Sequence, residues 1–245
     1  MPLLFLDTET TDINAAARLI QLAYKDTGSG ESINEYFKPP APVSISFGAM
    51  AVHHITPKMV TDKPAFQGSP TQTKLLELLK DHLLVAHNAP FDVNILHNEG
   101  VRVETGRYID TLRLAKHLIT SEQYKLQYLR YFLNLDASAN AEALPHDAMG
   151  DVIILESLFE YLSNEIQKKF TLGGTDEIIK KMLELTQTPV LLKTLTFGKY
   201  INQTFQEVAA ADRNYLEWLS ASESKKPKAE QNEELVYTLG CYLKR

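Results

Sequence analysis

The order of strand-like and helix-like segments constrains the fold of this chain more than any other feature. Three segments with apolar or alternating residues come first and are predicted to be strands: residues 3–6, 18–25 and 31–38. One more strand is predicted at residues 83–87, and helical periodicity marks residues 71–82, 91–98, 111–119, 125–133 and 147–169. Early strands followed by helices that alternate with a further strand predict an α/β fold, with a mixed sheet flanked by helices.

The predicted α/β domain spans residues 1–170. Gly173 and Gly174 favour a break in the chain, and residues 171–189 are predicted to form a linker with one short helix. The last segment, residues 190–245, is predicted to be a small C-terminal unit, since about 55 residues bury only a marginal core alone. We therefore expect one large domain with a small appendage.

Charge and cysteine content narrow the class of protein. The formal net charge is −6, which argues against a protein that coats nucleic acid passively, because such proteins are usually basic. No stretch approaches the roughly 20 apolar residues that span a bilayer, and no signal peptide is visible, so no membrane partner is expected. Cys241 is the only cysteine, which excludes an intrachain disulfide and predicts a cytoplasmic location.

Two acids follow the first predicted strand. Asp7 and Glu9 are separated by one residue, so in an extended chain their side chains point to the same face. Carboxylates held on one face repel each other unless a cation lies between them. An exposed turn after a short edge strand would also contain such residues, and the pair alone does not decide between the two interpretations.

Three further residues belong to the same argument. Asp92 stands where the strand at 83–87 gives way to a helix, and His146 and Asp151 stand near the start of the long helix. Taken singly, each has a structural explanation, because acids are favoured in the first turn of a helix. Taken together, four carboxylates and a histidine suit a site for two Mg²⁺ ions about 3.5–4 Å apart, with the histidine as a general base near neutral pH.

The order of these motifs resembles a known family. Asp-x-Glu at residue 7, His-Asn-x-x-Phe-Asp ending at Asp92, and His-x4-Asp ending at Asp151 resemble the DEDDh exonucleases. The resemblance implies a ribonuclease H-like fold and hydrolysis of phosphodiesters from 3′ ends. It also implies that Asp7, Glu9, Asp92 and Asp151 hold two Mg²⁺ ions, which Mn²⁺ could replace, and that His146 is the general base.

The resemblance extends to residues that would touch the substrate. Residues 49–64 and 194–219 match one branch of the family, so the similarity covers most of the chain. It implies substrate-binding roles for Thr10, His53, Asn88 and Phe91, with a loop-supporting His53 and a core Phe91 as the alternatives. Asp12 and Gly48 depart from the pattern of many members and leave the fit around the terminal nucleotide open.

The function expected from the resemblance is a 3′→5′ exodeoxyribonuclease. It would act on single-stranded DNA and on 3′ ends of duplexes, release 5′-mononucleotides, and serve DNA repair or recombination. RNA is the alternative substrate, for a ribonuclease or an oligonucleotide hydrolase with the same chemistry, and a 2′-hydroxyl decides between the two. A different class, a non-catalytic nucleic-acid-binding module, would usually lack one of the five residues. For residues 190–245, stabilisation of the first domain and binding of DNA both remain candidate roles.

Overall fold

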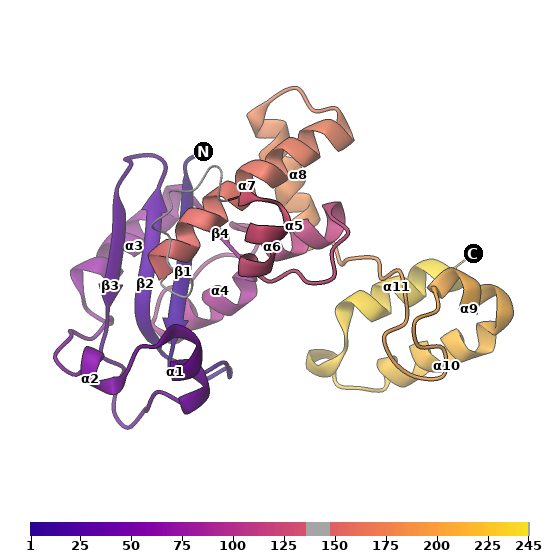
Figure 1. Ribbon diagram of the computed structural model, residues 1–245, viewed down its shortest axis with the longest axis horizontal. Helices are drawn as coiled ribbons and strands as arrows, with labels where there is room; N and C mark the ends of the chain where they lie inside the picture. Colours follow the sequence, from indigo (N-terminus) through magenta and orange to yellow (C-terminus); the bar gives the residue numbers. More distant parts are fainter. Residues whose placement is uncertain (136–147, 245) are drawn as a thin grey trace. The chain divides into compact units, whose positions relative to one another are not determined.

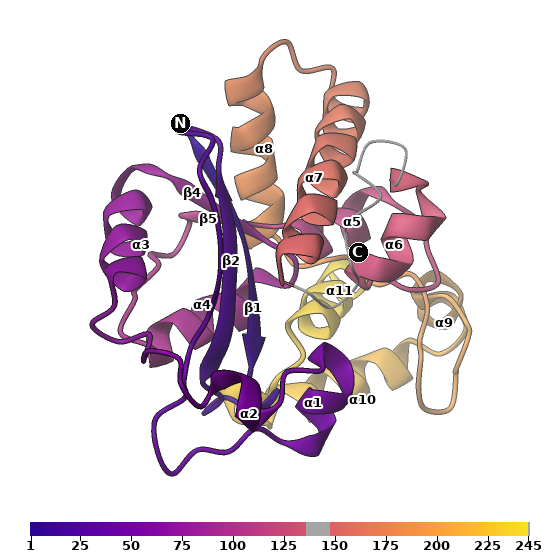
Figure 2. The ribbon, with the colours of Figure 1, turned by 60° about the vertical axis from the view of Figure 1, so that its left-hand side comes forward.

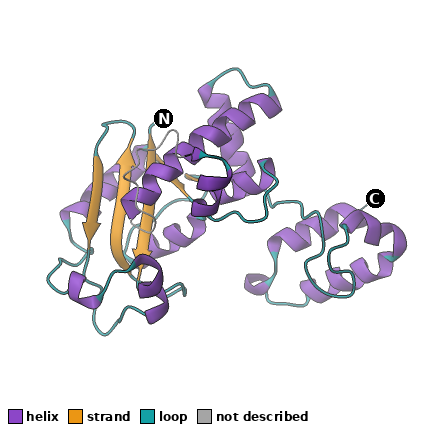
Figure 3. Ribbon diagram, in the orientation of Figure 1, coloured by secondary structure: helices purple, strands orange, loops and turns teal. Residues whose placement is uncertain are grey.

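The structure, a computed structural model, describes residues 1–135 and 148–244 (Figure 1). The chain divides into two compact units, Met1–Thr186 and Gln187–Arg245. Each unit has a hydrophobic core of its own. All strands of the described residues lie in the first unit, as Figure 3 shows, and no helix among those residues is long and apolar enough to cross a membrane.

A five-stranded sheet forms the centre of the first unit, in the order β3-β2-β1-β4-β5. Neighbours β1, β2 and β3 are antiparallel, whereas β1, β4 and β5 are parallel. The strands are β1 (Leu3–Thr10), β2 (Leu19–Asp26), β3 (Ser32–Tyr36), β4 (Leu83–Ala86) and β5 (Tyr108–Asp110). The predicted mixed sheet is confirmed, and the parallel arrangement brings the carboxyl ends of β1, β4 and β5 to one edge.

Helices cover both faces of this sheet, as the edge-on view in Figure 2 shows. One face packs against α3 (Pro70–Asp81) and α4 (Ala89–Asn98). The other packs against α5 (Thr111–Leu118), α6 (Leu126–Phe132), α7 (Ala148–Phe170) and α8 (Thr175–Gln187). Side chains of β1 alternate between the two cores, with Leu4 and Leu6 on the α3 and α4 side and Phe5 on the α7 side.

Three short elements were not predicted from the sequence: α1 (Phe47–His53), α2 (Pro57–Val60) and β5. Their lengths explain the omission, since such short segments contain too few residues for a periodic pattern. Strand β5 exists because Ile109 pairs with Val85 of β4 and is fully buried in the core. That pairing is a long-range contact, which local sequence does not reveal.

Helix α8 belongs to the first unit. Met182 is fully buried in the core beside α7, and the hydroxyl of Thr186 accepts a hydrogen bond from the backbone N–H of Asp110 at 3.1 Å. The segment expected to be a linker, residues 171–189, thus contributes to the first core as far as Thr186.

The second unit is helical. It contains α9 (Phe205–Ala211), α10 (Arg213–Ser224), a 3-10 turn (Lys228–Glu230) and α11 (Glu233–Leu243), which pack around Phe205, Leu216 and Leu239. The segment between Thr194 and Thr204 is a loop, held by one isolated bridge between these two residues.

Candidate active site

The first two acids of the site stand at the end of β1. Alternation along the strand turns Asp7 and Glu9 toward the side of the sheet that α7 covers, the side to which Phe5 also points. Asp7 pairs with Ala23 of β2 and Glu9 with Gln21, and the register shifts between Glu9 and Thr10. The regular strand therefore ends directly after the second acid, at an edge where the sheet gives way to loops.

Helix α7 brings a third acid to these two. Asp151 lies in its first turn, and the helix packs along β1 and β2. One carboxylate oxygen from each of Asp7, Glu9 and Asp151 lies within 4.8 Å of the others. Three negative groups at such distances repel one another, and a divalent cation that prefers oxygen ligands would relieve the repulsion. The donor set thus fits a hard divalent ion.

The fourth predicted acid, Asp92, lies in the first turn of α4, which packs on the opposite face of the sheet. The alternation that joins Asp7 and Glu9 turns Thr8 toward that face, where its hydroxyl donates a hydrogen bond to Asp92 Oδ1 at 2.7 Å. Asp92 is not one of the three acids whose oxygens converge. Burial, and to a smaller extent the nearby charge of Asp110, raise the pKa of Asp92 to about 7 although the Thr8 hydrogen bond opposes the rise.

One contact to the acidic cluster was not anticipated from the sequence. The side-chain amide of Gln127, in α6, donates a hydrogen bond to Oδ1 of Asp151, and Nη1 of Arg130 donates to Gln127 Oε1 at 3.5 Å. Arg130 is itself buried, with 7% of its surface exposed. No motif marks Gln127, and only the packing of α6 on α7 places it beside Asp151.

The predicted general base, His146, lies outside the residues that the structure describes.

Buried polar residues fix the position of α6 relative to β4. His87, directly after β4, lies with Nδ1 3.0 Å from the Thr111 hydroxyl and Nε2 2.7 Å from the Tyr124 carbonyl oxygen. Burial lowers the pKa of His87, so the neutral ring is favoured and Nε2 donates to the carbonyl. Since Tyr124 precedes α6, this contact ties the segment before α6 to the end of β4.

Asp110 is the N-cap of α5. Its Oδ1 accepts hydrogen bonds from the backbone N–H groups of Leu112, in α5, and of Asn88, before α4. One carboxylate thereby joins the ends of β4 and β5.

A cavity of about 400 Å³ opens beside Glu9. Its wall includes three of the predicted substrate-binding residues, Thr10, His53 and Phe91. Asn88 does not line this cavity; it is exposed and takes a left-handed conformation, φ 68°, at the start of α4. Much of the lining is apolar, so the cavity can receive a flat hydrophobic group next to the acidic cluster.

Hydrogen bonds hold the end of β1 and the end of α1 together at this cavity. The Nδ1 atom of His53 accepts from the backbone N–H of Ile55 at 2.9 Å, so Nε2 carries the proton and donates to the carbonyl oxygen of Thr10 at 3.2 Å. The Thr10 hydroxyl donates to the carbonyl oxygen of Asp12 at 2.7 Å. In this arrangement His53 and Thr10 shape the cavity, and both are at most 6% exposed.

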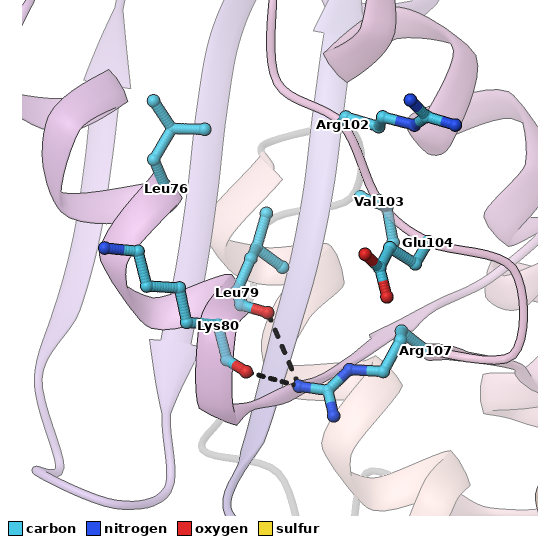
Figure 4. Close-up of a pocket in the computed structure, with 7 residues that line it drawn as sticks. All are labelled: Leu76, Leu79, Lys80, Arg102, Val103, Glu104 and Arg107. Atoms are coloured by element: carbon cyan, nitrogen blue, oxygen red, sulfur yellow. Dashed lines mark hydrogen bonds between the residues drawn. The ribbon is translucent and has the colours of Figure 1, made fainter.

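A second cavity, of about 270 Å³, lies between α3 and the segment before β5 (Figure 4). Arg107 crosses it and donates from Nη2 to the carbonyl oxygens of Leu79, Lys80 and His82, which close the carboxyl end of α3. This cavity adjoins the amino ends of β4 and β5, whereas the acids gather at the carboxyl end of β1. It is therefore separate from the acidic site.

Comparison with known proteins identifies two matching families. The family described as Exonuclease matches residues 4–159, which include Asp7, Glu9, Asp92 and Asp151. A second family, described as Exodeoxyribonuclease X-like C-terminal, matches residues 195–223 in the second unit.

Individual relatives and a solved structure agree with these matches. Exodeoxyribonuclease 10 of Escherichia coli (strain K12) is 30% identical over 217 residues, which cover 87% of this chain and 88% of the relative. The DNA polymerase III subunit epsilon of Buchnera aphidicola is 31% identical over 175 residues, covering 64% and 70%. A structure of exonuclease X in complex with 5′ overhanging duplex DNA superposes with a TM-score of 0.55 at 25% identity, covering 75% of this chain and 99% of that chain. The predicted ribonuclease H-like exonuclease fold is confirmed.

Proposed function

Since this chain belongs to the exonuclease family that its residues 4–159 match, we propose that it is a 3′→5′ exodeoxyribonuclease, a metal-dependent hydrolase that shortens DNA from its 3′ ends. The observation that carries the proposal is the convergence of Asp7, Glu9 and Asp151 on one point at the end of the sheet. We assign the activity to the first compact unit, Met1–Thr186, which contains every proposed catalytic residue.

The enzyme depends on divalent metal ions, which an exonuclease of this family requires and the acidic cluster suits. We propose Mg²⁺ as the ion and two ions as the complement, with Asp7, Glu9, Asp92 and Asp151 as protein ligands. Ions bound there would supply the positive charge that stabilises the attacking and the leaving oxygen in a phosphoryl displacement. We include Asp92 among the ligands for an electrostatic reason. Burial raises the pKa of its carboxyl group, and a cation nearby would lower that pKa and so favour the charged form that binds a metal.

The chain's own groups carry out the remaining steps. His146 acts as the general base and accepts a proton from the water that attacks the terminal phosphodiester. The water oxygen forms a bond to phosphorus, and the bond between phosphorus and the 3′ oxygen of the penultimate nucleotide breaks. That oxygen takes up a proton and becomes the new 3′-hydroxyl of the strand, and a 5′-mononucleotide is released. Gln127 holds the Asp151 carboxylate in one orientation during the reaction.

The cavity beside Glu9 is the proposed pocket for the 3′-terminal nucleoside. Its apolar wall, which includes Phe91, suits a base, and Thr10 and His53 hold the rim next to the acids. Single-stranded DNA and 3′ ends of duplexes are the proposed substrates, since the matched solved structure holds a DNA duplex with an overhang. We propose that this activity serves DNA repair or recombination in the cytoplasm.

The test is digestion of matched DNA and RNA oligonucleotides labelled at the 5′ end, with Mg²⁺ and with EDTA. We expect a ladder of successively shorter DNA products with Mg²⁺, slower digestion of RNA, and no products with EDTA. A 3′-terminal phosphate should block digestion, because the pocket receives a free terminal nucleoside. Cleavage of a closed circular single strand would instead identify an endonuclease and contradict the proposal.

A further inference from the structure

The second unit exposes three large apolar side chains between residues 197 and 218. Trp218 in α10 is 62% exposed, Ile201 is 54% exposed and Phe197 is 42% exposed. The last two belong to the loop between the paired residues Thr194 and Thr204. Apolar side chains of this size are usually buried, so three of them together indicate a surface that another molecule covers.

Close contacts hold this loop against α10. Gly198 has φ 76°, and a Cβ atom there would lie 2.3 Å from the hydroxyl oxygen of Tyr215, so only glycine allows the approach. Tyr215 in turn lies next to Trp218, with ring centroids 5.7 Å apart. Gly198, which follows Phe197 in the chain, and Trp218 therefore both lie against the same tyrosine.

Asp212, the N-cap of α10, ties the other side of the loop. It accepts hydrogen bonds from the Tyr200 hydroxyl at 2.7 Å and from Lys199 Nζ at 3.1 Å. The Tyr200 ring packs edge-on against Tyr215 at 5.0 Å and is covered by Lys199. Tyr200 is thus a structural residue, whereas Phe197 and Trp218 remain accessible.

Two lysines border the exposed aromatic residues. The Lys199 side chain is 63% exposed at the edge of the loop. Lys225 follows Trp218 by seven residues, two helical turns along the same face of α10, and within the described part of the chain its side chain makes no ion pair or hydrogen bond. Cations beside accessible aromatic rings match the chemistry of single-stranded nucleic acid, whose phosphates attract lysines and whose bases stack on aromatic faces.

We propose that the face formed by Phe197, Ile201 and Trp218, bordered by Lys199 and Lys225, binds single-stranded DNA by base stacking. The inference rests on the proposed function, because the strand bound by the second unit is the strand that the first unit degrades. Both units belong to one chain, so a strand held by the second unit stays at high effective concentration near the catalytic site. The surface would favour long strands over short ones.

Trp218 is the only tryptophan of the chain, and its fluorescence reports directly on this face. The experiment titrates the full-length protein with an unlabelled thymidine oligonucleotide of about 20 nucleotides, with EDTA present to prevent hydrolysis. Base stacking on the indole should quench the fluorescence with a saturable dependence on DNA concentration. Fluorescence anisotropy of a labelled strand measures total binding in parallel. Saturated anisotropy without any quenching would overturn the proposal.

Variants separate this surface from the catalytic site. Trp218→Ala should bind the long strand about tenfold more weakly and should lose processive digestion of it. Tyr237→Ala is the matched control, since Tyr237 is an exposed aromatic residue of the same unit, 38% exposed, on α11. The control should bind like the wild type, and both variants should keep the wild-type thermal midpoint.

A trinucleotide substrate distinguishes failure of this inference from failure of the proposed function. It is short enough to occupy the catalytic cavity alone, so Trp218→Ala should hydrolyse it at the wild-type rate. Loss of all hydrolysis in the wild type would refute the exonuclease assignment. Equal affinity of Trp218→Ala and wild type for the long strand would refute the DNA-binding face. A lower molecular mass of Trp218→Ala in light scattering would also refute it, and would identify a contact between copies of the chain.

Discussion

The side-chain amide of Gln127 donates a hydrogen bond to one carboxylate oxygen of Asp151. Because Arg130 donates to the amide oxygen of Gln127, the NH₂ group is the side that faces the acid. A donor on one oxygen orients the carboxylate that converges with those of Asp7 and Glu9. Helix α6 thereby acts on the site although it carries none of the predicted catalytic residues.

Gln127→Leu tests this relationship. The variant keeps the size of the side chain and removes the donor, so Asp151 should lose its fixed orientation, and Mg²⁺ affinity or activity should fall by about 10- to 100-fold. Activity measured against Mg²⁺ concentration should recover in part at high Mg²⁺. Gln123→Leu, at an exposed position before α6, is the control and should match the wild type. An unchanged Mg²⁺ dependence in Gln127→Leu would show that Asp151 does not need this contact.

Asp7→Asn and Asp151→Asn should abolish hydrolysis without destabilising the metal-free protein. Each substitution removes a negative charge from a cluster in which the charges repel, so the thermal midpoint in EDTA should stay constant or rise. Addition of Mg²⁺ should raise the midpoint of the wild type, because the ion binds the folded state, and should raise it less in the variants. Asp62→Asn, at an exposed site, is the control. A variant that keeps near-normal turnover would remove its residue from the site.

His146→Ala should lower the rate by about 10²- to 10⁴-fold, the usual contribution of general acid–base catalysis. The residue is proposed as a base and not as a metal ligand, so Mg²⁺ binding measured by calorimetry should survive the substitution. The wild-type rate should fall at low pH as the base becomes protonated, and this limb of the pH profile should be missing in the variant. Lost metal affinity would instead identify His146 as a ligand.

The pH dependence of stability should depend on Asp26, which is buried at the end of β2. Burial alone would raise its pKa, but hydrogen bonds from Ser29, the Gly28 N–H and His82 outweigh burial and lower the pKa. In the unfolded chain the group titrates near its ordinary pKa of about 3.9. The stabilisation is therefore present above about pH 4 and is lost as the pH falls through the lowered pKa of the folded state.

Asp26→Asn measures this contribution. At pH 7 the variant should lose about 1–3 kcal/mol of unfolding free energy, since several donors to a charged acceptor are weakened. Urea unfolding at a series of pH values should show the difference from the wild type shrinking below about pH 4. The exposed Asp62→Asn should show no such difference at any pH. A constant gap between Asp26→Asn and the wild type down to pH 2 would contradict the assigned role.

The sequence by itself determined the fold class and the identity of the acids. Asp7 and Glu9 share a face because successive side chains of a strand alternate, and this follows from spacing alone. The long amphipathic helix predicted at residues 147–169 is α7, Ala148–Phe170, with Asp151 in its first turn. Both are local properties, in which a residue's neighbours along the chain decide its direction.

Only the tertiary structure decided which groups meet. Thr8 joins Asp92 on the far face of the sheet, Gln127 reaches Asp151 from another helix, and Gly198 allows its loop to approach Tyr215 closely. The same packing turns Tyr200 inward and leaves Trp218 accessible. Each relationship joins residues of different elements, and its geometry depends on how whole helices and loops pack, which no local pattern of residue types contains.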